Sequence, residues 1–314
     1  MLGVYLLPKP NIPTAKTQTM QKFLYLLIFA SICLPGLYAQ SNLIRVPDVL
    51  ALPVSPPDAV LSYGPDSLQF GALRVPHTGN IPYPVVVIIH GGCWLSAYDL
   101  HLMDAIATSL SEAGYATWNL EYRRVGDQAG GWPNTFLDVA KGINHLRLIA
   151  GKYKLDLDRV VVIGHSAGGH LALWSAMQDQ LPAGSEIKLD DPLPLAGVVS
   201  LAGIVDPESY LVREGQSCGT SVDELLGGLP EDLPDRYREA SPLKMAPLGT
   251  PQILISGTED TIVPLTHVEP YYKNARQRGD RIRLKKIKQA GHFEVIAPGS
   301  VAWPSVMKAI RKLI

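Results

Sequence analysis

The chain has 314 residues, of which 46% are hydrophobic and 18% are charged, and its net charge is −1. This composition is typical of a globular protein and excludes a disordered or collagen-like chain. The charge argues against a nucleic-acid partner, since phosphate binding requires a basic face. Three cysteines are too few for a disulfide scaffold or a cysteine-based zinc site.

Residues 1–39 have the layout of a secretory signal peptide. They carry three lysines and no acidic residue, and the run 23–34 is apolar apart from one serine. This run is too short to cross a bilayer core of ~30 Å, and a Pro-Gly pair ends it. A small residue, Ala39, precedes Gln40, so we expect cleavage there, export, and no stable membrane insertion afterwards. Met20 is a candidate for the true start, and an uncleaved membrane anchor is the alternative.

Residues 40–314 are expected to form one α/β domain after an irregular, proline-rich lead-in at 41–66. Continuous Val/Ile-rich runs predict strands buried on both faces of a parallel sheet. The predicted strands are 85–90, 116–122, 160–164, 197–201, 252–256 and 282–287, and the predicted helices are 100–113, 135–150, 168–177, 267–278 and 301–313. This alternation predicts a doubly wound, mostly parallel sheet with helices on both faces.

Two further local patterns bear on this organisation. Thr266 and Glu269 have the spacing of a capping box for the helix at 267–278, and Gly279 suits its far end. Residues 205–247 interrupt the alternation with prolines, a Gly-Gly pair and a cluster of acidic residues. We expect this segment either to cover the site like a cap or to form a solvated surface loop.

The sequence Gly-His-Ser-Ala-Gly-Gly at residues 164–169 follows a predicted strand and opens a predicted helix. This is the context in which a G-x-S-x-G motif exposes a nucleophilic serine on a tight turn. Ser166 is therefore the candidate nucleophile. The amide of Ala167 lies at the helix N-terminus, where it can stabilise an oxyanion.

A serine hydroxyl needs a base, and the base needs an orienting acid. His292 follows the strand predicted at 282–287 and is the candidate base. Asp260 follows the strand predicted at 252–256 and is the candidate acid, with Glu259 as the alternative. The order Ser166, Asp260, His292 is that of α/β-hydrolases.

A glycine-rich segment, residues 90–94, follows the strand predicted at 85–90. Glycine there lets the backbone approach a substrate oxygen closely, so we expect the amides of Gly92 and Cys93 to join that of Ala167 in an oxyanion hole. Trp94 and Trp132 either line a substrate pocket or pack in the core. Arg123 and Asp138 are expected to form a structural pair beneath the site. No two of the histidines have metal-ligand spacing.

Together these segments resemble α/β-hydrolases, and more narrowly the esterases of the hormone-sensitive-lipase and feruloyl/acetyl-esterase-like groups, and also kynurenine formamidase. The matching segments are 90–94, 122–123, 132–133 with Asp138, 164–169, 257–264 and 291–295. The resemblance implies Ser166, Asp260 and His292 as catalytic triad, and Gly92, Cys93 and Ala167 as oxyanion donors. Many relatives have a third glycine where this chain has Cys93. Since the donor is a backbone N–H, the function should survive.

The leading hypothesis is a serine hydrolase that cleaves carboxylic esters through an acyl-enzyme, with no cofactor implied. The expected substrate is a small or polysaccharide-linked ester, such as an acetyl or feruloyl ester. One alternative is hydrolysis of an arylformamide or another amide, although a secretion signal argues against intracellular kynurenine metabolism. A second alternative is a non-catalytic binding module on the same fold. The sequence favours no oligomeric state, and it does not decide whether Cys93 and Cys218 pair.

Overall fold

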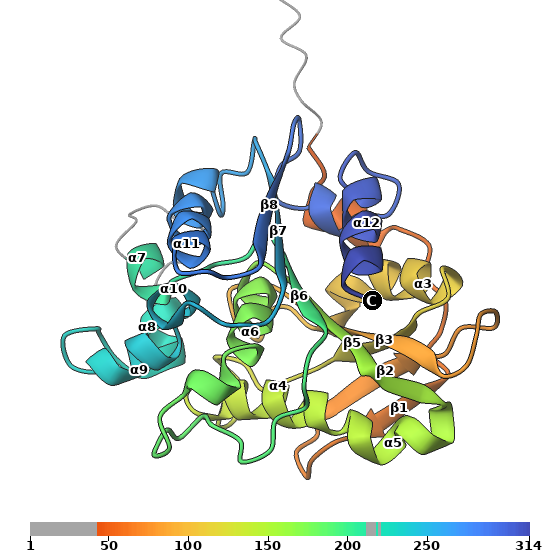
Figure 1. Cartoon of the computed structure of the whole chain (residues 1–314), viewed down its shortest axis with the longest axis horizontal. Helices are drawn as coiled ribbons and strands as arrows, with labels where there is room; N and C mark the ends of the chain where they lie inside the picture. Colours follow the sequence, from red (N-terminus) through yellow and green to blue (C-terminus); the bar gives the residue numbers. More distant parts are fainter. Residues whose placement is uncertain (1–42, 212–217, 219–220) are drawn as a thin grey trace, which may run out of the picture. The chain divides into compact units, whose positions relative to one another are not determined.

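The computed structural model describes residues 43–211, residue 218 and residues 221–314, so the predicted signal peptide lies outside the described residues. Eight strands of this part form one sheet in the order β1-β2-β4-β3-β5-β6-β7-β8 (Figure 1). The strands are β1 (Ala59–Ser62), β2 (Phe70–Arg74), β3 (Tyr83–Ile89), β4 (Ala116–Leu120), β5 (Leu155–His165), β6 (Gly197–Leu201), β7 (Gln252–Gly257) and β8 (Ile282–Ile287). From β4 to β8 neighbouring strands are parallel, whereas β2 runs antiparallel to both β1 and β4.

Helices cover both faces of the sheet (Figure 1), as the alternation of elements predicts. One face packs against α4 (Asn134–Asn144), α5 (Leu146–Tyr153), α6 (Ala167–Ser175) and α11 (Leu265–Gln277). The other face packs against α2 (Val46–Leu50), α3 (Asp104–Glu112) and α12 (Trp303–Leu313). Three short 3-10 helices complete these layers: η1 (Leu100–Met103), η2 (Gln178–Gln180) and η3 (Glu294–Ile296). The predicted doubly wound, mostly parallel fold is confirmed.

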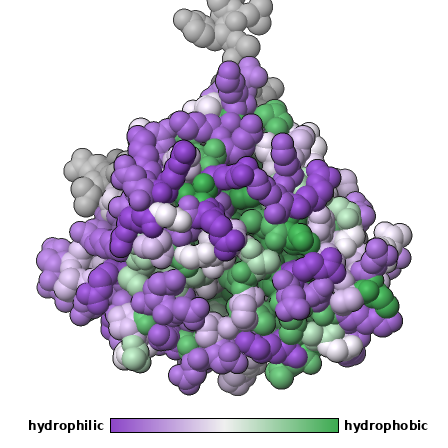
Figure 2. Space-filling view, in the orientation of Figure 1, coloured by the Kyte–Doolittle hydropathy of each residue, from purple (hydrophilic) through white to green (hydrophobic). Residues whose placement is uncertain are grey.

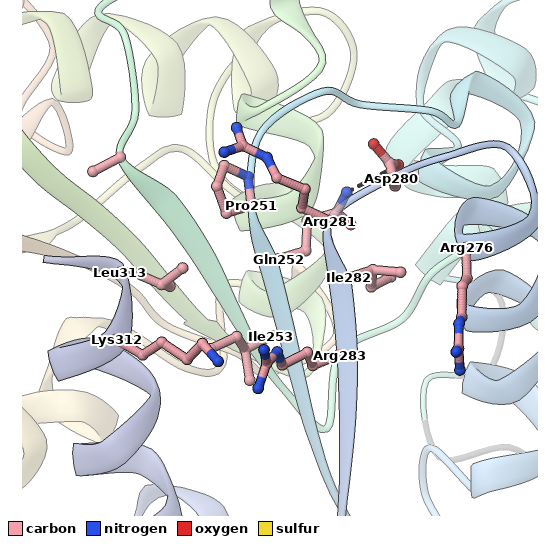
Figure 3. A pocket seen from close by; sticks show the side chains of 11 residues that line it. Pro251, Gln252, Ile253, Arg276, Asp280, Arg281, Ile282, Arg283, Lys312 and Leu313 are labelled. Atoms are coloured by element: carbon pink, nitrogen blue, oxygen red, sulfur yellow. Dashed lines mark hydrogen bonds between the residues drawn. The ribbon is translucent and has the colours of Figure 1, made fainter.

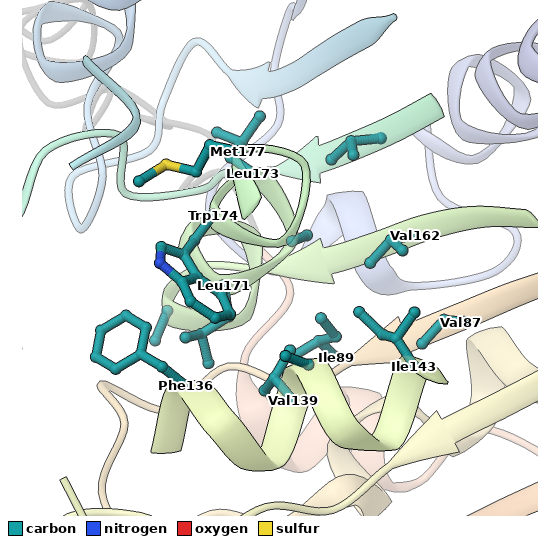
Figure 4. Packing of buried hydrophobic residues seen from close by; sticks show 14 of the residues in the cluster. Val87, Ile89, Phe136, Val139, Ile143, Val162, Leu171, Leu173, Trp174 and Met177 are labelled. Atoms are coloured by element: carbon teal, nitrogen blue, oxygen red, sulfur yellow. The ribbon is translucent and has the colours of Figure 1, made fainter. Parts of the chain in front are cut away.

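The central strands divide their side chains between two cores. Val87 and Val162 belong to the core under α4 and α6, while their neighbours Ile88 and Val161 belong to the core under α3 and α12. This division follows from the twofold alternation of side chains along a strand. Figure 4 shows the first core, where Phe136 of α4 and the aliphatic residues around it meet α6.

Several local predictions fail. The lead-in at 41–66 is not wholly irregular, because α2 and β1 lie within it. The single helix predicted at 135–150 is divided at His145 into α4 and α5. Helix α11 begins at Leu265 with Pro264 at its N-cap, so Thr266 lies inside the helix and the predicted capping box is wrong. Gly279 does follow the end of this helix, in a left-handed conformation with φ 92°.

Within residues 205–247 the structure places four short helices: α7 (Pro207–Leu211), α8 (Ser221–Leu226), α9 (Pro234–Glu239) and α10 (Pro242–Met245). Buried Asp206 anchors the start of the segment, because its carboxylate accepts a hydrogen bond of 2.7 Å from the Ser241 hydroxyl. The amide of Trp132 donates to the carbonyl of Leu225 at 2.7 Å. The segment is therefore packed against the body of the domain. Of the helices in the described residues, none is long and apolar enough to cross a membrane.

Candidate active site

Ser166 occupies the tight turn between β5 and α6, with φ 54° and ψ −118°. Its backbone is held by hydrogen bonds on both sides: its N–H donates to the carbonyl of Leu201 at 2.9 Å, and its carbonyl accepts from the amides of His170 at 3.1 Å and Ile204 at 3.3 Å. A Cβ added at Gly164 would lie 2.0 Å from the carbonyl oxygen of Gly168, and one added at Gly168 would lie 2.3 Å from that of Ile89. Only glycine fits both positions, which explains why the motif flanks the serine with glycines.

Asp260 and His292 meet beyond the carboxyl ends of β7 and β8. The Nδ1 of His292 lies 2.8 Å from Oδ2 of Asp260, and both residues are buried. The other carboxylate oxygen of Asp260 accepts hydrogen bonds of 2.8 Å from the amides of Ile262 and Val263. These two hydrogen bonds fix the orientation of the carboxylate toward the imidazole. In the described residues His292 contacts Asp260 and makes no hydrogen bond to Glu259, the alternative acid.

His165, directly before Ser166, links the serine turn to the His292 loop. Its Nε2 donates to the carbonyl oxygen of His292 at 3.0 Å, and the two ring centroids are 4.6 Å apart. A carbonyl can only accept, so the neutral His165 ring carries its proton on Nε2. Burial, and then the charge of His292, lower the pKa of His165 well below its usual range. A neutral ring is therefore retained next to the candidate base.

The glycine-rich segment after β3 lies against the serine. A Cβ added at Gly91 would be 3.1 Å from the Cβ of Ser166. Gly92 and Cys93 both have positive φ, 108° and 56°, which turns the chain sharply here. The N–H groups of Gly92, Cys93 and Ala167 donate to no acceptor within the described part of the chain. Three unused donors next to a serine are what an oxyanion hole requires.

A buried polar network around Glu121 holds the start of this glycine-rich segment. The carboxylate of Glu121 accepts from the amides of Leu100 and Tyr122, each at 3.0 Å, and lies 3.1 Å from Nε2 of His90. Burial alone would raise the pKa of Glu121, but His90, Arg124 and the amide of Tyr122 outweigh it and lower that pKa. The carboxylate therefore stays charged and holds the first residue of the segment.

A disulfide joins the same segment to residues 205–247. Cys93 is bonded to Cys218, with the two Cα atoms 5.1 Å apart. The pairing that the sequence left open is thus made in the structure. Cys93 therefore carries one of the unused N–H groups, and its sulfur ties the glycine-rich segment to residues 205–247.

The two tryptophans differ in their surroundings. Trp94 is fully buried and packs edge-on to His170, with ring centroids 5.4 Å apart. Of the two places that the sequence leaves open for Trp94, its complete burial among core residues favours the core. Trp132 is partly exposed, contacts Phe136 edge-on at 5.4 Å and lies beneath the guanidinium of Arg236 at 5.4 Å.

The expected structural pair of Arg123 and Asp138 is present. The guanidinium donates to the two carboxylate oxygens in two hydrogen bonds of 2.7 Å each, and Asp138 is fully buried. This pair orders the chain just after β4. No group of three or more His, Cys, Asp or Glu side chains that could hold a metal occurs among residues 43–211, 218 and 221–314.

One residue beside the site was not singled out from the sequence. The carboxylate of Glu294 accepts from the amide of Gly291 at 2.8 Å and from the amide of Ile44 at 2.7 Å. It therefore fastens the start of the described chain to the loop that carries His292. Ile44 and Glu294 are 250 positions apart, so no local spacing could have indicated this contact.

The BD-FAE family model matches residues 72–274, which is more than half of the chain. The chain belongs to the BD-FAE family. Its match contains Ser166 and Asp260, together with the glycine-rich segment after β3. This result confirms the resemblance to feruloyl-esterase-like α/β-hydrolases.

Relatives of this BD-FAE protein include two proteins named as esterases. Esterase LipC of Mycobacterium tuberculosis is 26% identical over 247 residues, which are 76% of this chain and 58% of LipC. A probable isoprenylcysteine α-carbonyl methylesterase of Oryza sativa is 26% identical over 234 residues, 71% of this chain and 55% of that protein. The chain thus spans a little over half the length of these curated relatives.

Solved structures share the fold. A truncated carbohydrate esterase from gut microbiota superposes with a TM-score of 0.71 at 21% identity, covering 83% of this chain and 96% of that one. Esterase 2 of Thermogutta terrifontis superposes with a TM-score of 0.66 at 20% identity, covering 84% and 95%. The BD-FAE chain therefore has the fold of α/β-hydrolase esterases.

Proposed function

We propose that this protein is an exported serine hydrolase that cleaves carboxylic esters through an acyl-enzyme. The observation that carries the proposal is the juxtaposition at the carboxyl ends of the strands: a strained Ser166, a buried His292–Asp260 pair, and three amide donors unused within the described chain. Such an arrangement serves nucleophilic acyl transfer. The esterase names of the relatives, and the superposable carbohydrate esterase, support the same class.

In the proposed mechanism Oγ of Ser166 attacks the ester carbonyl carbon while Nε2 of His292 takes the hydroxyl proton. Asp260 accepts from Nδ1 of His292, which leaves Nε2 unprotonated and ready to act as the base. The carbonyl oxygen becomes an oxyanion, held by the N–H groups of Gly92, Cys93 and Ala167. The N-terminal end of α6 adds its positive dipole at the same place.

The tetrahedral intermediate collapses when His292 returns its proton to the leaving alcohol oxygen. This step breaks the bond between the carbonyl carbon and the alcohol and leaves the acyl group on Ser166. Water then attacks the acyl-enzyme with His292 again as base, and the second collapse releases the carboxylic acid and restores the serine. Each step uses only residues of the chain and water.

Two further observations support the proposed export and substrate class. A disulfide between Cys93 and Cys218 suits an oxidising compartment outside the cytosol, which agrees with the leader expected at 1–39. An exported esterase encounters esters on extracellular polymers, and one of the superposable structures is that of a carbohydrate esterase. Acetyl or feruloyl groups on polysaccharide are therefore the proposed substrates.

The test combines active-site labelling with a substrate panel. A fluorophosphonate probe should label the wild-type protein and not Ser166→Ala. The panel contains short acyl esters, acetylated xylan, a feruloyl ester and formylkynurenine. Ester turnover that is lost in Ser166→Ala supports the proposal. Faster turnover of the formamide would favour the arylformamidase alternative, and absence of both labelling and turnover would indicate a binding module.

A further inference from the structure

Cations gather on one side of the sheet, away from Ser166. Along β8 the side chains alternate, so Arg283 and Lys285 face the α12 side of the sheet while Leu284 faces α11. Helix α12 presents Lys308 and Lys312, one turn apart, to the same space. We call Arg283, Lys285, Lys308 and Lys312 the basic groove; all four are exposed.

The four cations of the basic groove have no acidic partner in the part of the chain that the structure describes. Other cations nearby do pair: Lys286, on the opposite face of β8, contacts Glu269 at 2.5 Å. Like charges four residues apart on a helix are destabilising, and Lys308 and Lys312 are such a pair. The arrangement therefore costs stability unless an anion is bound between them.

The groove is hollow and has an apolar floor. Two cavities of about 610 and 400 Å³ adjoin along it and share Ile253, Arg283 and Lys312, and volumes of ~300–1,000 Å³ are usual for ligand sites. Figure 3 shows the side chains of Arg283 and Lys312 pointing toward one another across the space between β8 and α12. Apolar side chains, including Ile253 and Leu313, lie between the cations, and Figure 2 shows apolar residues on this face bordered by hydrophilic ones.

Among the described residues, only one acidic side chain lines these cavities, and it is already engaged. Asp280 accepts from the amides of Leu248 and Gly249 at 2.8 and 2.9 Å and from the side-chain amide of Gln252 at 3.1 Å. It stabilises the turn before β7 and does not approach the four cations as an ion-pair partner. The groove thus presents net positive charge, although the whole chain has a net charge of −1.

The position of the groove separates it from the candidate active site. Its cavities are lined by the residues that begin β7 and β8, Gln252 and Ile282. Asp260 and His292 follow the opposite, carboxyl ends of the same strands. A six-residue strand spans ~20 Å, so a ligand in the groove leaves the site accessible to a second segment of a long molecule.

We propose that the basic groove binds an acidic polysaccharide, a glycan chain that carries uronate carboxylates. Carboxylates match the four cations, and the apolar faces of sugar rings match the floor at Ile253 and Leu313. An extended chain, rather than a small anion, would occupy two adjoining cavities. The proposal rests on the proposed function, since anchoring a polymer at a distance from the active site is useful to an enzyme that deacylates polymers.

The test measures binding of polygalacturonate and of neutral xylan to the full chain carrying Ser166→Ala, by affinity electrophoresis at low salt and at 0.3 M NaCl. In the double variant Arg283→Gln/Lys312→Gln, the dissociation constant for polygalacturonate should rise about tenfold, because two exposed ion pairs with uronate carboxylates are lost and exposed pairs each contribute only modestly. The control Arg147→Gln/Lys152→Gln removes the same charge from α5 and should change binding less than twofold. Binding should be weaker at 0.3 M NaCl, because the Debye length is then shorter than the ~10 Å that it has at 0.1 M.

Three results would overturn the proposal: equal weakening by both double variants, equal binding of neutral xylan, or preferential binding to vesicles that contain phosphatidylglycerol, which would indicate a membrane surface instead. Turnover of a short acyl ester is measured separately, in the Ser166 protein with and without Arg283→Gln/Lys312→Gln, and should not change. If the protein is inactive but still binds polygalacturonate through the groove, only the proposed function is rejected. If the protein is active but does not bind polygalacturonate, only the proposal for the groove is rejected.

Discussion

Ser166, Asp260 and His292 each depend on backbone groups that hold them in place. The turn at Ser166 requires glycine at positions 164 and 168, and the Asp260 carboxylate is oriented by the amides of Ile262 and Val263. Side chains held in this way lose little freedom when substrate binds, which is the condition for effective acyl transfer. The residue scale is therefore where the proposed chemistry can be tested most directly.

Removal of the nucleophile or base should abolish most turnover. We expect Ser166→Ala or His292→Ala to lower kcat roughly 10⁴–10⁶-fold with the fold retained. Asp260→Asn should cost somewhat less, because the acid orients the base and does not react. Steady-state kinetics on a short acyl ester, with circular dichroism of each variant, measures this. A mild Asp260→Asn and a severe Glu259→Gln would mean that the acid is assigned wrongly.

The disulfide at Cys93 changes what a cysteine variant reports. Cys93→Gly keeps the backbone N–H but breaks a bond between residues 125 positions apart. Loss of a native disulfide typically costs ~2–5 kcal/mol, so we expect a lower free energy of unfolding and a kcat that stays within about tenfold. Cys218→Ser is the matched control, because it breaks the same bond and keeps the Cys93 side chain. A kcat that collapses in Cys93→Gly and not in Cys218→Ser would show that the Cys93 side chain is needed beyond the disulfide, which would contradict the backbone-donor role.

At the scale of elements, the loop that carries His292 is held by a contact with the beginning of the described chain. Glu294 accepts from the amides of Gly291 and Ile44, and Leu43 packs against Gly291, whose added Cβ would lie 3.1 Å from it. The strap at 43–44 and the loop therefore stabilise one another. Movement of this loop would displace the His292 imidazole from Asp260.

Glu294 should consequently act as a positioning residue for His292. In Glu294→Gln one of the two carboxylate oxygens becomes an NH₂ group, so one buried amide loses its acceptor, at a cost of ~1–3 kcal/mol. We expect a lower free energy of unfolding and a kcat reduced about tenfold with little change in KM. Urea unfolding and steady-state kinetics measure both effects. Glu269→Gln on the surface of α11 is the control, and equal kinetic effects in the two variants would contradict a positioning role.

The central strands could be predicted because continuous apolar runs have few alternative interpretations. Strands β1 and β2 could not: β1 has four residues with alternating exposure at the end of the sheet, so it lacks such a run. The capping-box prediction at Thr266 failed because Pro264, with its extended backbone, takes the N-cap position one residue before α11. Spacing alone does not rank competing start signals.

The candidate triad could be proposed from the sequence because each member lies within five residues after the end of a strand, and parallel strands end at one edge. The Cys93–Cys218 bond and the contact of Glu294 with Ile44 join segments that are far apart in the sequence. Trp94 was undecided for a related reason: its position after a strand fits a pocket or a core equally well. Its burial depends on packing with α6 and α4, which only the tertiary structure provides.

For the whole molecule, buried histidines link stability to pH. Burial lowers the pKa of His170 to about 4 and that of His165 well below its usual range. In the unfolded chain both rings take up protons as the pH falls below ~6.5, while in the native protein they stay neutral. The unfolded state then binds more protons than the native state. Stability is therefore full above pH ~6.5 and is lost as the pH falls toward the native pKa values.

We expect the free energy of unfolding to decrease by several kcal/mol between pH 7 and pH 4.5, with His170 alone able to contribute up to about 3 kcal/mol at its native pKa. Carboxylates whose pKa is lowered, such as Glu121, reduce the free energy of unfolding only at lower pH. His101 has the opposite sign, because its hydrogen bond with Asp104 raises its pKa, but it is exposed and its effect is screened.

The variant His170→Gln separates this effect from general acid sensitivity. A glutamine amide can still donate to the carbonyl of Ala240, the partner of His170 at 2.7 Å, but it takes up no proton on unfolding. The variant should be less stable than wild type at pH 7, because it loses ring packing against Phe136 and Trp94, and should lose less on acidification. Urea unfolding of wild type and variant at pH 7, 6, 5 and 4.5 measures how the free energy of unfolding of each depends on pH. The exposed His77→Gln is the control. An unchanged slope in His170→Gln would mean that other groups carry the acid sensitivity of the fold.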